Sequence, residues 1–423
     1  MEHERRKTRA WVLHPELTSD FERRAAGPAL EEAVSLARAL PDLDVVGSEV
    51  VRLARPHPGL LFGTGKIEEL GARFKAGEVE LVLVDGPLSP VQQRNLERQW
   101  KVKILDRTGL ILEIFSDRAA TREGVLQVEM AALSYQRTRL VRAWTHLERQ
   151  RGGLGFVGGP GETQIEADRR AIDEQLVRLR RQLDKVVKTR TLHRAARAKV
   201  PYPIVALVGY TNAGKSTLFN RLTGAEVMAK DMLFATLDPT MRRVVLPDGP
   251  EVILSDTVGF ISDLPTELVA AFRATLEEVL GADLILHVRD ISHDETAEQA
   301  QDVTAILGSL GVEDERPMFE VWNKIDRLDE TDREQAVVRA GRDDHVYPIS
   351  AITGEGLDVL LEAIATALAG HRRDEELRLD FADGRRRAWL FAQDVVVSEE
   401  QDDEGFVIQV RWTEKQARQY AGL

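Results

Sequence analysis

The sequence predicts an α/β fold in which a first parallel-sheet domain carries a long antiparallel helical hairpin. A second, mostly parallel-sheet domain and a small α+β appendix follow. Three observations support this class. Short apolar runs alternate with helical patterns in two stretches, which is typical of parallel sheets. Two long segments between these stretches place apolar residues three and four positions apart. The end of the chain alternates apolar and polar residues about an acidic turn, SEEQDDEG.

The first domain, 1–118, is predicted from the apolar runs AWVL, LVLVD and VKIL, which alternate with helical patterns. From about 119 two long amphipathic segments take over, on either side of the stretch 151-RGGLGFVGGPGETQ-164. Two long helices joined by a loop form an antiparallel hairpin. We therefore assign 119–199 to a helical hairpin with a glycine-rich loop.

The second parallel-sheet domain is assigned to 200–370. Pro201 and Pro203 mark its start. Six apolar runs follow with helices between them: IVALV, RRVVL, EVILSD, DLILHV, PMFEVW and HVYPIS. The appendix, 371–423, is predicted as a strand, a short helix and the two alternating runs WLFAQDVVVS and FVIQVRW.

Composition narrows the functional class. The chain is 43% hydrophobic and 30% charged, as globular proteins are. It contains no cysteine, which excludes disulfides, thiolate zinc sites and cysteine nucleophiles and fits a reducing compartment. The N-terminal residues are too charged for a signal peptide, and no apolar run approaches the roughly 20 residues that span a bilayer. We expect a cytoplasmic protein without a membrane partner, and a monomer because no long heptad seam is present.

Charge is distributed unevenly. Residues 135–199 carry sixteen Lys and Arg against seven Asp and Glu, a local charge of +9. The whole chain has a net charge of −13, so the remainder sums to −22. A basic segment on an acidic body is typical of a protein that presents one face to a polyanion.

A phosphate-binding loop is the strongest motif. The stretch 209-GYTNAGKST-217 fits G-x-x-x-x-G-K-[ST], with an apolar strand before it and a helical segment after it. Backbone N–H groups at a helix N-terminus would hold phosphate oxygens, Lys215 would reach the β- and γ-phosphates, and Ser216 would hold Mg²⁺.

Guanine specificity is predicted from 323-NKID-326, which follows the run PMFEVW. A carboxylate at Asp326 can accept both guanine N1–H and N2–H₂, a donor pair that adenine lacks. Asn323 and Lys324 would brace the loops around the base. The stretch 350-SAITGEG-356 follows the next strand, where backbone N–H groups would meet guanine O6.

The stretch 256-DTVG-259 ends the run EVILS. Asp256 would hold Mg²⁺ through water, and the Gly259 amide would sense the γ-phosphate. In the preceding loop, 231-DMLFATLDPT-240, we expect Thr236 to ligate Mg²⁺, with Thr240 as the alternative. Lys215, Thr236 and Gly259 form the predicted catalytic set.

These motifs together resemble those of translation-factor-class GTPases, with all five guanine-nucleotide motifs in order. The residues predicted to bind GTP and GDP are Gly209, Tyr210, Thr211, Asn212, Ala213, Gly214, Lys215, Ser216, Thr217, Asp256, Gly259, Asn323, Lys324, Asp326, Ser350 and Ala351.

Two positions modify this prediction. Phe260 stands where Ras-type proteins have a glutamine that orients the attacking water, and a phenyl ring cannot do so. We therefore expect slow hydrolysis by the isolated protein. Asn212 matches the position at which potassium-activated GTPases hold K⁺, and stabilisation of a loop turn is the alternative.

The glycine-rich loop is predicted to contact structured RNA. Six glycines between 152 and 161 cannot support an apolar core, and a plain linker would not need such a loop. Glycine also permits close approach to a ligand, and neighbouring arginines and one phenylalanine suit phosphates and bases. The predicted RNA-binding residues are Arg149, Arg151, Gly153, Phe156, Gly158, Gly159, Arg169 and Arg170.

The same stretches carry a family resemblance. G-G-x-G-x-x-G-G-P-G-E-T-Q followed by E-x-D-R-R, with G-Y-T-N-A-G-K-S-T, L-F-A-T-L-D-P-T and D-T-V-G-F downstream, resembles the HflX family of ribosome-associated GTPases over essentially the whole chain. The resemblance implies binding to 23S rRNA in the 50S subunit, insertion of the hairpin loop near the peptidyl transferase centre, and separation of stalled or idle 70S ribosomes. It also implies that the ribosome completes the site at Phe260.

Family members have also been credited with ATP use by the N-terminal domain. The stretch 62-FGTGKIEEL-70 contains G-T-G-K, and Lys66 before a helix could meet a phosphate. It lacks the spacing of a phosphate-binding loop and a partner for Mg²⁺, so a tight strand-to-helix turn is the competing interpretation.

Two other functional classes compete with a ribosomal GTPase. A metabolic kinase or ATPase is disfavoured by Asp326, by Phe260 and by the lack of an obvious insertion for an acceptor substrate. A scaffold or protein-directed switch would use the hairpin as a coiled-coil interface, which its basic excess and glycine tip disfavour. Salt dependence of binding separates an RNA partner from a protein partner.

Overall fold

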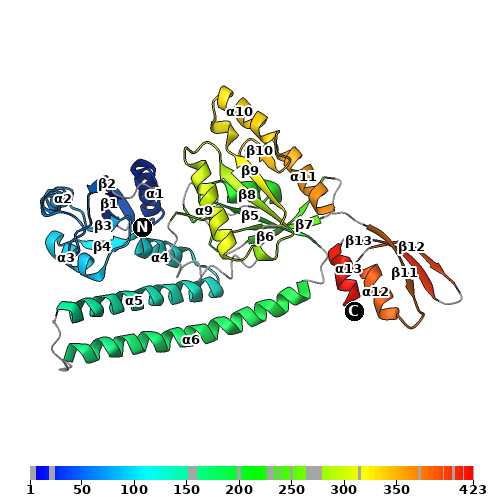
Figure 1. Ribbon diagram of the computed structural model, residues 1–423, viewed down its shortest axis with the longest axis horizontal. Helices are drawn as coiled ribbons and strands as arrows, with labels where there is room; N and C mark the ends of the chain where they lie inside the picture. The colour runs from blue at the N-terminus through cyan, green and yellow to red at the C-terminus, as the bar shows by residue number, and fades with distance from the viewer. Residues whose placement is uncertain are drawn as a thin grey trace, which may run out of the picture.

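The computed structural model describes the chain in four structural parts (Figure 1). The described residues are 6–18, 24–150, 160–197, 202–225, 233–234, 236–237, 240–247, 251–262, 279–312, 316–369, 373–393, 395–402, 405–412 and 414–422. Among these residues, no helix is both long and apolar enough to cross a membrane.

The N-terminal domain is built on a four-stranded sheet of order β2-β1-β3-β4, in which every pairing is parallel. Its elements are β1 (Thr8–Leu17), α1 (Ala26–Arg38), β2 (Leu43–Leu53), α2 (Thr64–Ala76), β3 (Leu81–Val84), α3 (Pro90–Trp100), β4 (Lys103–Asp106) and α4 (Arg107–Arg118). The parallel sheet confirms the predicted class. Strand β2 was not among the predicted strands because polar residues interrupt its apolar pattern and it lies at the sheet edge.

The hairpin consists of α5 (Arg122–Gln150) and α6 (Pro160–Arg197), which run side by side below the two sheet domains (Figure 1). Helix α6 begins at Pro160, inside the stretch that the sequence assigned to the glycine-rich loop. Proline is favoured at the first position of a helix because its missing N–H has no intrahelical partner there.

The second sheet domain, the G domain, has six strands in the order β10-β9-β8-β5-β7-β6. All pairings are parallel except β6 with β7, so the predicted mostly parallel sheet is confirmed. Its elements are β5 (Ile204–Gly209), α7 (Lys215–Thr223), β6 (Thr240–Val245), β7 (Glu251–Asp256), β8 (Leu284–Asp290), α9 (Thr296–Ser309), β9 (Met318–Asn323), η1 (Ile325–Arg327), α10 (Glu330–Ala340), β10 (Val346–Pro348) and α11 (Leu357–Ala369).

The C-terminal part is an antiparallel three-stranded sheet of order β11-β13-β12 with two short helices. Its elements are β11 (Arg373–Leu379), α12 (Gly384–Ala392), β12 (Val396–Gln401), β13 (Phe406–Trp412) and α13 (Glu414–Ala421). The prediction of one strand over WLFAQDVVVS was wrong in its first half. Residues 389–392 end α12, where Leu390 is fully buried and the neighbouring Phe391 is exposed, so this helix presents one apolar face to the sheet.

Candidate guanine-nucleotide site

A pocket lies where β5, β7 and β9 end, at the carboxyl edge of the G-domain sheet, which is where open parallel sheets bind ligands. The predicted nucleotide-binding residues that line it are Thr211, Asn212, Gly214, Lys215, Ser216, Thr217, Thr236, Gly259, Asn323, Lys324, Asp326 and Ala351. The other predicted residues, Gly209, Tyr210, Ala213, Asp256 and Ser350, do not line the pocket and lie buried next to it.

The phosphate-binding loop joins β5 to α7, whose first residue is Lys215. The Lys215 ammonium donates to the carbonyl oxygens of Gly209 at 3.1 Å and Tyr210 at 2.8 Å. Burial disfavours its charge and lowers the pKa of Lys215 to about 8, although Asp256 opposes the shift. The negative charge of a phosphate group beside Nζ would favour the charged form of this buried ammonium.

Gly214 closes the loop with a positive φ of 97°. A Cβ atom at this position would come within 2.2 Å of the Asn323 amide nitrogen, so a side chain would break the contact between the loop and β9. Glycine is therefore required by both the backbone conformation and the space available.

Three predicted ligands of magnesium meet in one place. The Ser216 hydroxyl donates to Asp256 Oδ2 at 2.7 Å, the Thr236 hydroxyl donates to the same oxygen at 2.9 Å, and the two hydroxyls lie 2.9 Å apart. Thr236, rather than the alternative Thr240, supplies this hydroxyl, since Thr240 begins β6.

The donor set fits a magnesium ion. Asp256 Oδ1 is buried without a hydrogen-bond partner among the described residues, and burial raises the pKa of this carboxyl. Hydroxyl and carboxylate oxygens are the ligands that Mg²⁺ takes in nucleotide sites. Ser216 and Thr236 would hold the ion directly and Asp256 through water, and the ion would neutralise charge on the β- and γ-phosphates.

The segment 256–262 begins at the last residue of β7 and is called switch II below. Gly259 packs so closely on the phosphate-binding loop that a Cβ atom would lie 2.9 Å from Thr211 Cα and 3.1 Å from Lys215 Nζ. The Phe260 side chain is 1% exposed and packs in an apolar cluster instead of lining the pocket. Asn212 lines the pocket with a positive φ of 60°, and its role toward K⁺ stays a prediction.

The base-binding end is braced by Asn323. Its amide nitrogen donates to the Ala213 carbonyl at 2.8 Å, and its amide oxygen accepts from the Ala351 N–H at 3.0 Å. Asn323 thus ties the phosphate-binding loop to the 350–356 loop. Asp326 lies in η1 with its side chain exposed to the pocket, as base recognition requires.

Sequence reasoning missed Asp290 as a part of this end. The Lys324 ammonium donates to Asp290 Oδ2 at 2.7 Å, and both side chains are largely buried. Asp290 is the last residue of β8 and Lys324 directly follows β9, its neighbour in the sheet. A polar residue at the carboxyl end of an apolar strand was the available signal.

Most predicted RNA-binding residues cannot be placed. Residues 151–159 lie outside the described part of the chain, and so does the side chain of Arg149. Arg169 and Arg170 are exposed on α6, and Arg169 lies 4.0 Å from Asp173 one turn along. These assignments stay predictions.

Lys66, the residue considered for an N-terminal ATP site, forms ion pairs with Glu49 and Glu69. Its charge is therefore already compensated, and the two carboxylates would repel a phosphate group. This geometry favours the alternative of a structural turn between β2 and α2.

Comparison with known proteins matches four family models to successive parts of the chain. Family models match residues 28–116 (GTP-binding GTPase N-terminal), 118–197 (GTP-binding GTPase Middle Region), 204–324 (50S ribosome-binding GTPase) and 335–421 (HflX C-terminal domain). The last match begins inside the range that we assigned to the G domain, so the boundary at 370 stays a prediction.

Two similar proteins are GTPase HflX of Magnetococcus marinus, 49% identical over 91% of this chain and 87% of its own, and GTPase HflX of Escherichia coli, 46% identical over 84% and 83%. Among solved structures, a GTP-binding protein of Sulfolobus solfataricus in complex with GDP is 24% identical, with a TM-score of 0.46 over 85% of this chain and 98% of that one. The identity to the curated relatives, over nearly their full length, shows that this chain belongs to the HflX family of GTP-hydrolysing enzymes.

Proposed function

We propose that the protein binds the 50S subunit, separates stalled or idle 70S ribosomes into subunits, and hydrolyses GTP rapidly only when bound to the ribosome. In this proposal GTP binding orders switch II and the loop that carries Thr236, and hydrolysis allows release. The proposed cofactors are Mg²⁺ at Ser216 and Thr236 and K⁺ beside Asn212. The protein acts as a monomer.

The long basic hairpin is the observation that carries this proposal. Helices α5 and α6 run side by side along one side of the molecule, so the end of α5 and the start of α6 lie together at one end of a long rod (Figure 1). The local charge of +9 over 135–199 suits a cavity lined by phosphate groups. A long rod that is basic in sequence can reach RNA while the acidic remainder of the chain stays outside.

Phe260 supports the requirement for the ribosome. A buried phenyl ring offers neither a donor nor an acceptor to the attacking water. In our proposal a group from RNA or protein of the 50S subunit acts on the attacking water in its place when the protein binds.

GTP turnover by the purified protein tests this proposal. It is measured alone, with 50S subunits, and with 50S subunits plus a variant lacking residues 152–161, each in KCl and in NaCl. We expect strong stimulation by 50S subunits that the deletion reduces, and higher turnover in KCl. Fast turnover without ribosomes would contradict the proposal, and equal turnover in the two salts would remove the K⁺ site.

Subunit separation is tested with Gly158 and Gly159 replaced by valine. Branched side chains would prevent close approach of the loop backbone, so splitting of 70S ribosomes should be lost while GTP affinity is retained. Measuring 50S binding at several salt concentrations separates the alternatives. A steep loss of affinity with salt supports an RNA contact, and a flat profile supports the competing protein-directed switch.

A further inference from the structure

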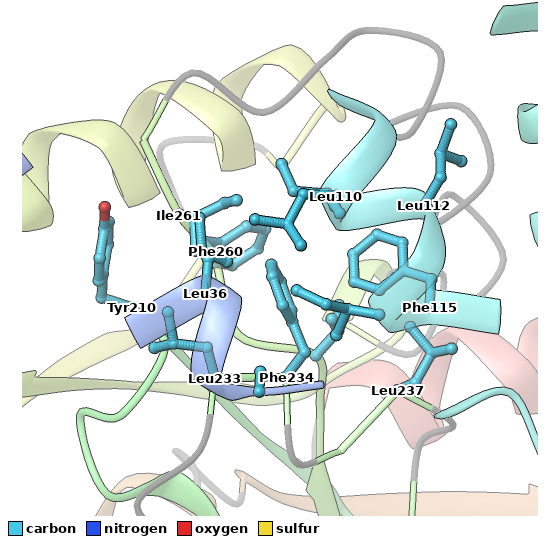
Figure 2. Close-up of a cluster of buried hydrophobic side chains, with 14 of the residues drawn as sticks. Leu36, Leu110, Leu112, Phe115, Tyr210, Leu233, Phe234, Leu237, Phe260 and Ile261 are labelled. Atoms are coloured by element: carbon cyan, nitrogen blue, oxygen red, sulfur yellow. The ribbon is translucent and has the colours of Figure 1, made fainter. Parts of the chain in front are cut away.

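The nucleotide-binding G domain and the N-terminal domain share one buried apolar cluster (Figure 2). Leu110 and Phe115 come from α4 of the N-terminal domain, whereas Phe234 and Phe260 come from the two loops that sense GTP. The rings of Phe115 and Phe234 meet edge to face with centroids 4.6 Å apart. Both nucleotide-sensing loops therefore pack against the N-terminal domain.

A buried polar cluster lies beside these rings. The Tyr210 hydroxyl, in the phosphate-binding loop, donates to the carboxylate of Glu32 on α1 and accepts from the Ser262 N–H at 2.6 Å. Arg24 donates to the same hydroxyl at 2.9 Å. One side chain of the phosphate-binding loop thus connects switch II to the N-terminal domain.

The backbone N–H, the carbonyl oxygen and the hydroxyl of Ser262 all form hydrogen bonds. Its hydroxyl donates to Glu32 at 2.7 Å, and Arg107 on α4 donates to its carbonyl oxygen at 2.9 Å. The side chains of Glu32 and Arg107 are only 11% and 8% exposed, and these two residues also form an ion pair. We call Glu32, Arg107, Tyr210 and Ser262 the interdomain clamp.

The backbone that follows Gly259 is held at two points, by the phosphate-binding loop at Phe260 and by the clamp at Ser262. The Phe260 N–H donates to the Gly209 carbonyl at 3.1 Å, and the Thr211 N–H donates to the Phe260 carbonyl at 2.7 Å. With Ser262 also fixed, the Gly259 backbone has little freedom to leave Lys215.

We infer that Glu32 and Tyr210 are positioning residues for GTP hydrolysis, which hold switch II through Ser262 so that the Gly259 amide is in place for the γ-phosphate. Neither side chain lines the nucleotide pocket, so both act through the backbone of switch II. Because the clamp crosses the domain boundary, docking of the N-terminal domain favours GTP over GDP. By linkage, GTP must favour docking to the same extent.

The clamp also lies next to the hairpin. Asp106, the residue before Arg107, accepts hydrogen bonds from Tyr135 at 2.6 Å and Arg139 at 2.9 Å, both on α5. A movement of α5 relative to the sheet would therefore move α4 and the guanidinium that holds Ser262. This inference concerns recognition of the γ-phosphate and goes beyond the proposed ribosomal role.

Full-length Glu32→Gln, Tyr210→Phe and the double variant test the clamp, with Glu31→Gln as the matched control. Glu31 is the exposed neighbour of Glu32 on the same helix. Affinities for a non-hydrolysable GTP analogue and for GDP are measured without ribosomes, together with kcat and KM for GTP. We expect each clamp variant to lower the GTP-over-GDP preference about tenfold and to lower kcat.

Both changes act on the contact between Tyr210 and Glu32: phenylalanine removes the hydroxyl, and glutamine removes the negative charge but keeps an acceptor oxygen. The double variant should therefore lose less than the sum of the two single losses. Glu31→Gln should behave like the unaltered protein. Equal losses of GTP and GDP affinity, or a clamp variant that matches Glu31→Gln, would overturn the inference. If Glu32→Gln does not fold, Ser262→Ala is the substitute, because it removes only the hydrogen bonds of the Ser262 hydroxyl with Glu32 and Arg107. This variant must also lower the preference for GTP over GDP. Failure of ribosome splitting in other assays leaves these ribosome-free results unaffected.

Discussion

The two ends of the nucleotide pocket are built differently. At the base end, Asn323 and Lys324 are braced by Ala213, Ala351 and Asp290, which all belong to the G domain. At the phosphate end, the loops that carry the nucleotide-sensing residues pack against α1 and α4 of the N-terminal domain. One end is complete within its own domain, and the other depends on a neighbour.

The different construction of the two ends suits two different tasks, recognition of the base and transmission of the presence of the γ-phosphate. The identity of the base must be read in the same way at every stage of a cycle, so rigid bracing inside one domain suits it. The presence of a γ-phosphate has to be transmitted, and transmission requires an element whose two positions are stabilised differently by two ligands. In our inference, the contact between the predicted nucleotide-sensing loops and the N-terminal domain has this property.

The largest effect is expected from Asp326→Asn at the base end. An amide cannot accept from both guanine donors, and losing two charge-assisted hydrogen bonds should lower GTP affinity about 100-fold. The amide can donate to the O2 atom of xanthine, so XTP binding should improve. Equilibrium binding of GTP, XTP and GDP measures this, with exposed Asp344→Asn as the control. GTP and GDP should weaken equally, and an unchanged base preference would exclude Asp326 as the base reader.

The sequence indicated residues that meet at both ends of the pocket, but it did not indicate the clamp, for a physical reason. The predicted base-reading motif, 323–326, and the phosphate-binding loop, 209–217, are short and contiguous, and each follows a strand, so a local pattern is enough to indicate them. The clamp joins Glu32 and Arg107 to Tyr210 and Ser262, residues that are far apart in sequence. A glutamate or an arginine in an amphipathic helix is usually exposed, so the sequence does not indicate that Glu32 and Arg107 have buried partners in another domain. The packing of the two domains shows these partners.

The pH dependence of the free energy of unfolding should also differ between two parts of the G-domain sheet. A histidine in the sheet interior should contribute to it, and a histidine beside the sheet edge should not. Burial, with Arg289 and Lys215 adding to it, lowers the pKa of His287 in β8 to about 4. An unfolded chain takes up this proton near pH 6.5, so the unfolded state gains protons first and stability falls as the pH drops from 6.5 toward 4. Between pH 7 and 5 the loss is about 2 kcal/mol.

His287→Leu should remove that part of the pH dependence, as measured by urea-unfolding midpoints at pH 7 and 5. His345→Leu is the control, because this side chain beside edge strand β10 is 67% exposed. The control should leave the pH dependence unchanged. If His287→Leu retained the full dependence, other buried groups would have to account for it.

A smaller effect is expected from Thr236→Ala. The Thr236 hydroxyl lies with Ser216 and Asp256, so its loss should weaken binding of GTP with Mg²⁺ about tenfold and spare GDP, since the loop engages only the triphosphate. Titrations with and without Mg²⁺ measure the difference. Thr240→Ala is the matched control at the start of β6 and should bind both nucleotides normally. The reverse pattern would restore Thr240 as the ligand.

The smallest effect is expected from the aromatic contact between the domains. Phe115→Leu keeps an apolar side chain but loses the edge-to-face contact with Phe234, so the GTP-over-GDP preference should fall about threefold. Phe74→Leu is the matched control, because Phe74 packs against Trp11 and Trp100 inside the N-terminal domain. Both substitutions should lower the unfolding midpoint similarly, since both rings are buried. Only Phe115→Leu should alter nucleotide preference. An equal effect of both would mean that the N-terminal domain acts on the pocket through its stability alone and not through this contact.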